Sequence, residues 1–224
     1  MTNKINQFFI ILLILLPLFL ITGPAIPDII ITFSGIFFLI FIVFKDVSFN
    51  IINNKFVQIS AVFWLSLIFI SFFAIDKEKS FQDSIIFLRL LIIPISCYFL
   101  FFKENKNFNY LLLIIFILVI FVCIDTLFQF FNYTAKDGFG EDLLGFKSNW
   151  YGRLTGPFGD ELITGSYVSK FGLLGYVFLL INNKFKFNFF IQIIYLSTIL
   201  VVCFISGERM ALATYSLALI LLFL

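Results

Sequence analysis

Histidine is absent from this chain, and charged residues of every kind are scarce. The 224 residues include no His, three Arg, three Cys and only 12% Asp, Glu, Lys and Arg. Without His, the chain lacks the commonest general base and metal ligand of proteins. Cys97, Cys123 and Cys203 lie in apolar runs without metal-like spacing. We therefore interpret them as small buried residues and predict no metal site.

Most of the chain is apolar. Apolar residues make up 62% of it, and the mean hydropathy is +1.10. A soluble domain is about half apolar and a quarter charged, so this chain could not cover its surface in water. The composition predicts an integral membrane protein. The net charge of +2 is too small to indicate a nucleic-acid partner.

The apolar residues occur in runs long enough to cross a bilayer, which takes about 20 residues per helix. We predict an all-α, polytopic transmembrane helix bundle with about eight spans: 5–22, 26–44, 56–75, 83–102, 110–132, 161–181, 187–206 and 209–224. Five spans fall in an N-terminal part (1–133) and three in a C-terminal part (161–224), with a periplasmic loop (134–160) between them. The last run is short for a span, so we interpret the chain as an N-terminal portion of a longer protein.

Lysine and arginine counts in the short loops predict the orientation, because cytoplasmic loops carry the positive excess. With the N-terminus in the cytoplasm, the inner segments hold seven lysines and two acids: Lys4, Lys45, Lys55, Lys103, Lys106, Lys184 and Lys186, with Asp46 and Glu104. The outer segments then hold most of the acidic residues, among them Asp137, Asp160, Glu161 and Glu208.

All three arginines fall on the outer side in this topology, whereas every inner basic residue is Lys. Arginine is favoured where paired hydrogen bonds to phosphate or carboxylate are needed. Arg89 lies about six residues into the fourth predicted span and Asp125 near the outer end of the fifth. Ionisable groups inside a membrane normally pair or line a cavity. An Arg89–Asp125 ion pair is one hypothesis, and a polar cavity with Arg89 in its floor is the other.

The other two arginines lie near the outward-facing starts of predicted spans. Arg153 belongs to a Gly-rich stretch (150–166), and Arg209 opens the last span. Helix N-termini favour anions, so this arrangement suits a phosphorylated ligand. We predict Ser206 and Asp160 as helix N-caps. The alternative is that both arginines pair with nearby acids, namely Glu208, Glu161 or Asp160.

Two short segments resemble the signature of the O-antigen ligase and O-antigen polymerase family. The first is Arg153-Leu154-Thr155-Gly156-Pro157-Phe158, followed by Asp160-Glu161 and Gly165-Ser166. The second is Ser206-Gly207-Glu208-Arg209-Met210-Ala211. The resemblance covers about residues 110–224. Departures are Gly159-Asp160 where many relatives have Pro-Asn, Met210 where many have Gly, and the lack of the large later periplasmic loop, which in ligases holds a His.

The resemblance implies a metal-independent glycosyltransferase of the bacterial inner membrane, without a cofactor, in lipopolysaccharide biosynthesis. The donor would be a glycan on undecaprenyl pyrophosphate, and the acceptor lipid A–core for a ligase or a lipid-linked glycan for a polymerase. It further implies that Arg153 and Arg209 are catalytic and stabilise the pyrophosphate. Arg89 and Ser206 would bind substrate, and Asp160 and Glu161 would bind sugar hydroxyls.

Two functions of other classes are alternatives. A transporter of an anionic solute would use the arginines to line a path, and it should show inverted repeats or broken helices. Neither is evident in the sequence. A non-catalytic subunit of an envelope polysaccharide system fits the absence of His.

Overall fold

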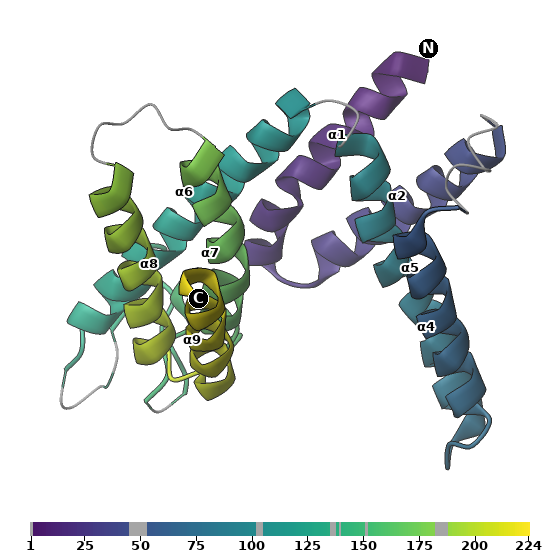
Figure 1. Cartoon of the computed structure of the whole chain (residues 1–224). Coiled ribbons are helices and arrows are strands. Elements are labelled where there is room, and N and C mark those ends of the chain that lie inside the picture. Colours follow the sequence, from purple (N-terminus) through teal and green to yellow (C-terminus); the bar gives the residue numbers. More distant parts are fainter. Residues whose placement is uncertain are drawn as a thin grey trace. The chain divides into compact units, whose positions relative to one another are not determined.

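Helices dominate the computed structural model, which describes residues 2–44, 53–101, 105–134, 138, 140–150, 152–181 and 188–224. Within these ranges it contains eight α-helices, two short 3₁₀ helices and no named strand (Figure 1). The α-helices are α1 (Thr2–Phe19), α2 (Ala25–Phe44), α4 (Lys55–Ser71), α5 (Lys77–Phe101), α6 (Asn105–Phe131), α7 (Thr164–Ile181), α8 (Asn188–Ile205) and α9 (Arg209–Phe223). The 3₁₀ helices are η1 (Leu20–Thr22) and η2 (Gly156–Phe158). The all-α prediction is confirmed for the described residues.

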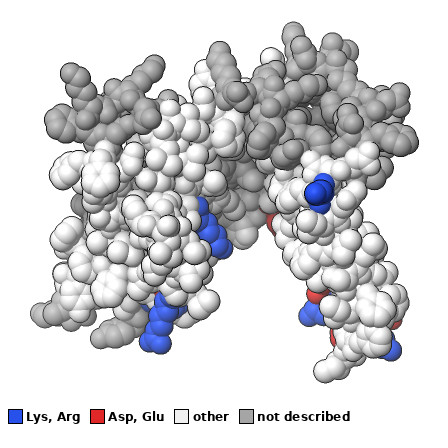
Figure 2. All heavy atoms as spheres, in the orientation of Figure 1, with Lys and Arg blue, Asp and Glu red and all other residues white. Residues whose placement is uncertain are grey.

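Three of these helices are long and apolar enough to cross a membrane: Lys77–Cys97 in α5, Asn107–Phe131 in α6 and Thr164–Ile181 in α7. The other five are apolar but shorter over their described residues. Figure 2 shows Lys, Arg, Asp and Glu at a few separate spots, with uncharged atoms over the rest of the visible described surface. The structure thus supports the membrane character that the composition predicted.

Some helices begin or end at other residues than the predicted spans do, and polar residues lie at several of these ends. The helix predicted over 83–102 begins earlier, at Lys77, because Asp76 Oδ1 accepts a 3.1 Å hydrogen bond from the backbone of Lys79. A side-chain acceptor placed there satisfies a free N–H of the first turn. The helix predicted over 56–75 ends at Ser71, which leaves a short turn before Asp76. The span predicted to start at residue 161 starts at Thr164.

The chain divides into two compact units. Unit 1 comprises Met1–Leu16 and Pro24–Phe108, and unit 2 comprises Pro17–Gly23 and Asn109–Leu224. In unit 1, α5 packs against both α2 and α4. Buried Phe38 and Ile92 form the centre of its small core. Trp64 Nε1 donates a 2.9 Å hydrogen bond to the carbonyl of Ser84, which joins α4 to α5.

Unit 2 holds the larger core, built by α6, α7, α8 and α9. Small residues let α7 approach α8 closely. A β-carbon added at Gly172 would lie 2.6 Å from Ile199 Cδ1. The hydroxyl of Tyr195 donates to the carbonyl of Gly172 at 3.1 Å. Cys123 and Cys203 are buried free thiols, which confirms their interpretation as core residues, while Cys97 is only partly buried.

Several residues on which the predicted orientation rests lie outside the described residues or have side chains outside them. These are the basic residues Lys4, Lys45, Lys103, Lys106, Lys184 and Lys186 and the acidic residues Asp46, Glu104 and Asp137.

Candidate functional site

The middle of the Gly-rich stretch (150–166) folds into the core of unit 2. Leu154 and Thr155 have no exposed surface, and Phe158 is 8% exposed and packs in the core cluster. Residues 156–158 form η2, which is buried throughout. Arg153, at the start of this segment, remains partly exposed. The segment is therefore anchored among the helices, and Arg153 stays partly exposed at its edge. We call the surface formed by Arg153 and by the turn that leads into Arg209 the rim.

Gln129 of α6 fixes this segment to the helices. Its side chain is fully buried, and its Oε1 accepts a 2.9 Å hydrogen bond from the backbone N–H of Gly156. Gly156 has φ +52°, and a β-carbon there would lie 2.8 Å from Thr126 Oγ1. Only glycine suits both the left-handed backbone and this close approach. On the other side, Thr164 Oγ1 donates to the carbonyl of Thr155.

Arg153 lies against the turn between α8 and α9. Its Nη2 is 3.5 Å from the carbonyl oxygen of Gly207, a long hydrogen bond. Gly207 has φ +76°, and a β-carbon there would lie 3.2 Å from both Arg153 Cγ and the carbonyl oxygen of Gly152. The structure therefore brings together the two segments that carry the family resemblance, although more than 50 residues separate Arg153 from Gly207.

Glu208, in the same turn, binds the N-terminus of α7. Its Oε1 accepts from the N–H of Gly165 at 2.7 Å. Its Oε2 accepts from the N–H and the hydroxyl of Ser166, at 3.0 and 2.6 Å. A carboxylate of the chain itself thus occupies the helix N-terminus that was predicted to suit an external anion.

The two predicted N-caps, Ser206 and Asp160, are wrong. Ser206 is fully buried, and its hydroxyl donates back to the carbonyl of Cys203 at 3.0 Å. The N-cap of α9 is Glu208, whose side chain makes no cap bond to its own helix. Asp160 lies four residues before α7 begins. Its carboxylate instead accepts from Asn149 Nδ2 at 2.6 Å.

Neither arginine of this rim forms an ion pair with an acid in the part of the chain that the structure describes. The alternative that Arg153 and Arg209 pair with Glu208, Glu161 or Asp160 is therefore not what the structure shows. Arg209 is the first residue of α9 and its side chain is exposed. Glu161 is partly exposed.

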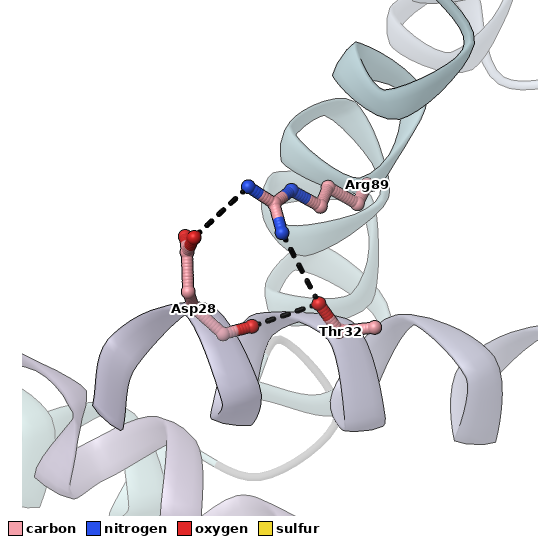
Figure 3. A network of polar contacts seen from close by, with 3 residues as sticks. All are labelled: Asp28, Thr32 and Arg89. Carbon is pink, nitrogen blue, oxygen red and sulfur yellow. Dashed lines mark hydrogen bonds and ion pairs between the residues drawn. The ribbon is translucent and has the colours of Figure 1, made fainter. Parts of the chain in front are cut away.

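Arg89 takes a partner other than the predicted Asp125. Its Nη2 forms a 3.1 Å ion pair with Asp28 Oδ2, and its Nη1 donates to Thr32 Oγ1 at 3.4 Å (Figure 3). Asp28 and Thr32 share one face of α2, and Thr32 Oγ1 also donates to the carbonyl of Asp28. The triad joins α2 to α5 within unit 1. Arg89 and Asp28 keep 33% and 52% of their side-chain surface exposed, so the structure supports a helix-pairing role for Arg89.

Asp125 binds backbone instead. It is fully buried on α6, and its Oδ1 accepts a 2.9 Å hydrogen bond from the N–H of Leu143. Asp142, 4% exposed, accepts with one oxygen from the N–H groups of Leu144 and Phe146 at 2.9 and 2.6 Å. The second oxygen of each carboxyl is buried without a hydrogen-bond partner. The two carboxyls thus hold the 142–146 turn on the end of α6.

The sequence did not predict the anchoring bonds of Gln129, Asp142 and Glu208. A signal was present for Gln129, because it follows Asp125 by four residues on one face of an apolar helix. No local pattern marks Glu208 as a partner of α7. Its role depends on where the α8–α9 turn lies in space.

The ends of α6, α7, α8 and α9 meet at this site, as the bonds of Gln129 and Glu208 show. Arg153 contacts the α8–α9 turn, and Arg209 follows that turn directly as the first residue of α9. Neither guanidinium group forms an ion pair with an acid among the described residues. Such groups bind phosphate or carboxylate ligands through charge-assisted hydrogen bonds. No group of three or more His, Cys, Asp or Glu in the described ranges could hold a metal ion.

The fold and the site define a helical protein with three described helices long and apolar enough to cross a membrane, and with an arginine-bearing rim. No protein family, no curated protein and no solved structure matches the chain.

Proposed function

We propose that the chain is a multi-pass protein of the bacterial inner membrane that acts in O-antigen assembly. In this proposal the eight helices are spans, the N-terminus is cytoplasmic, and the rim with Arg153 and Arg209 faces the periplasm. The three long apolar helices and the sparse surface charge support the membrane placement. The distribution of lysines and acids along the sequence supports the orientation.

The proposed reaction is glycosyl transfer from a donor linked to undecaprenyl pyrophosphate. A hydroxyl of lipid A–core, or of a second lipid-linked glycan, attacks the anomeric carbon of the donor sugar. The bond from that carbon to the pyrophosphate oxygen breaks, and its electron pair stays on the lipid pyrophosphate. The proton of the attacking hydroxyl passes to solvent water. Negative charge therefore grows on the pyrophosphate as the bond breaks.

One observation supports this assignment above the others. Arg153 contacts the carbonyl of Gly207, two residues before Arg209, and neither arginine has an acidic partner among the described residues. Fixed positive groups that face a developing negative charge are often the largest contribution to catalysis. Arg153 and Arg209 would stabilise the leaving pyrophosphate, and Asp160 and Glu161, next to Arg153's segment, would accept hydrogen bonds from sugar hydroxyls.

Complementation tests the proposal. The chain, expressed in its full native reading frame, is introduced into ligase-null and polymerase-null strains, and lipopolysaccharide banding is followed on gels. Restored attachment of O-antigen assigns ligase activity, and restored ladder length assigns polymerase activity. No change in either strain, with normal membrane levels, would count against transfer activity and favour the transporter or the non-catalytic subunit.

Point variants then test the arginines. Arg153→Lys keeps the charge but loses the planar donor pair, so we expect transfer to fall on the order of a hundredfold at unchanged membrane level. Lys147→Ala is the matched control, because Lys147 is a basic residue of the same loop with 63% of its side chain exposed. Wild-type transfer by Arg153→Lys would remove Arg153 from the mechanism.

A further inference from the structure

The α8–α9 turn carries a carboxylate and an arginine side by side, yet the two do not pair. Glu208 and Arg209 are consecutive, and Arg153 lies against the residue before them. An acid in this position would normally neutralise one of the two guanidinium groups. Instead, all three described hydrogen bonds of the Glu208 carboxylate go to Gly165 and Ser166 at the start of α7.

The hydrogen bonds to α7 fix the position of the α8–α9 turn as well as the position of the Glu208 carboxylate. Two backbone N–H groups and one hydroxyl bind both oxygens of Glu208 at 2.6–3.0 Å. The positive end of the α7 dipole adds to this attraction. Close packing supports the same geometry, because a β-carbon at Gly165 would lie 2.6 Å from Ser206 Oγ and 3.2 Å from Glu208 Cβ.

We propose that Glu208 is a positioning residue that holds Arg153 and Arg209 around one site for a pyrophosphate group. By binding α7, the carboxylate keeps the Ser206–Arg209 turn in register with Arg153. The same bonds hold the negative charge of Glu208 at the N-terminus of α7. Both guanidinium groups therefore stay free of an ion pair with Glu208 and can bind the ligand. This inference rests on the proposed function, since it assigns the arginines to a phosphorylated ligand.

The positioning role and a purely electrostatic role predict effects of opposite sign. Removal of a carboxylate beside two arginines should tighten the binding of an anion if only charge matters. If Glu208 positions the turn, its removal should weaken binding, because Arg209 is no longer held opposite Arg153. The sign of the change therefore separates the two roles.

The experiment measures the affinity of the full chain in detergent micelles for farnesyl pyrophosphate. Farnesol serves as the uncharged probe, and inorganic pyrophosphate reports whether the lipid tail contributes. We expect Glu208→Ala to weaken farnesyl pyrophosphate binding about tenfold or more, the scale of a lost charge-assisted hydrogen bond. Ser166→Ala, which removes one donor and leaves two, should weaken it about threefold. Glu141→Gln is the control, because Glu141 is an exposed acid of the same unit with its own lysine partner.

A double-mutant cycle gives the second readout. If Glu208 acts through Arg209, then Glu208→Ala should cost little further affinity in an Arg209→Gln background. Additive losses, unchanged affinity or tighter binding in Glu208→Ala would overturn the positioning role. Melting temperatures confirm that each variant is folded at the binding temperature. If Glu208→Ala does not fold, Glu208→Gln takes its place in the same cycle with the same criteria.

Failure of the proposed function has a different signature. If Arg153→Gln and Arg209→Gln bind farnesyl pyrophosphate as wild type does, or if farnesol binds equally well, the rim is not a pyrophosphate site. If the arginine variants bind weakly while Glu208→Ala binds normally, the site stands and the role of Glu208 fails.

Discussion

Gln129 Oε1 and the backbone nitrogen of Gly156 lie 2.9 Å apart, although 27 residues separate them in the chain. The bond is buried, and it ties the arginine-bearing segment to the end of α6. The position of Arg153 therefore depends on an amide inside an apolar helix. The stability of this link can be tested without knowledge of the ligand.

Gln129→Ala should lower the free energy of unfolding by about 1–3 kcal/mol, because the buried N–H of Gly156 loses its acceptor. Chemical unfolding in detergent, followed by tryptophan fluorescence, measures the change. Gln82→Ala is the matched control, because Gln82 is an exposed glutamine of α5. Equal effects of the two substitutions would show that the Gln129 bond adds no stability.

Gly156→Ala should destabilise the protein more than Gly159→Ala does. Both glycines have positive φ, +52° and +65°, but only at Gly156 would a β-carbon meet a neighbour, Thr126 Oγ1 at 2.8 Å. Backbone strain costs about 1 kcal/mol or more at either position, and a steric clash adds to it only at Gly156. Thermal unfolding of both variants measures the difference.

Removal of the clashing hydroxyl supplies the test of mechanism. Thr126→Ala should recover part of the stability lost in Gly156→Ala and should not help Gly159→Ala. If Thr126→Ala affects the two glycine variants equally, the close approach is not the cause.

Asp125→Asn should be tolerated, whereas Asp125→Ala should cost about 1–3 kcal/mol. Asn keeps an oxygen that accepts from Leu143 N–H and removes a negative charge from the neighbourhood of Asp142. Ala leaves the Leu143 N–H without its acceptor. Unfolding free energies measured at neutral pH compare the variants. A loss in Asp125→Asn as large as that in Asp125→Ala would show that the charge itself is required.

Charge reversal tests the ion pair of unit 1. Arg89→Asp should lower stability by roughly 1–3 kcal/mol, between the values typical of exposed and buried pairs. Adding Asp28→Arg should restore most of it, because the pair re-forms with opposite polarity. Adding Asp125→Arg, the partner predicted from sequence, should restore nothing. If Asp125→Arg instead restored the stability of Arg89→Asp, the partner of Arg89 would be Asp125 and not Asp28.

A matched pair of lysines tests the orientation. Lys147 lies in the loop proposed to be periplasmic, and Lys55 begins α4 at the proposed cytoplasmic end. In a background without the three native cysteines, Lys147→Cys should react with a membrane-impermeant maleimide added to intact cells. Lys55→Cys should react only after permeabilisation. The reverse pattern would place the N-terminus outside.

The partners of the charged residues could not be predicted from the sequence. An Arg89–Asp125 ion pair was one of two hypotheses, because the two residues lie at similar predicted depths in consecutive spans. Depth follows from counting residues, but pairing depends on how each helix is rotated about its axis. In the structure α5 packs against α2 and turns Arg89 towards Asp28. Asp125 lies under a turn whose path no periodicity predicts.

The arginine-bearing rim shows the same division. From their rarity and their segments, the sequence predicts that Arg153 and Arg209 carry the chemistry of the chain, and this stays a prediction. Ser206 and Asp160 were plausible N-caps by residue type. The carboxylate that binds the N-terminus of α7 is that of Glu208, because the α8–α9 turn brings it within 3.0 Å of two N–H groups.

The sequence by itself determined that the described chain is helical and apolar, because a helix satisfies its own backbone hydrogen bonds and needs only a continuous run of suitable residues. The agreement of α2 (Ala25–Phe44) and α9 (Arg209–Phe223) with the predicted spans follows from this local rule. Only the tertiary structure decided that Glu208 binds α7, that Gln129 holds Gly156, and that Arg89 pairs with Asp28. These bonds join residues 27–61 positions apart, and their geometry depends on helix rotation and loop path, which the apolar pattern leaves free.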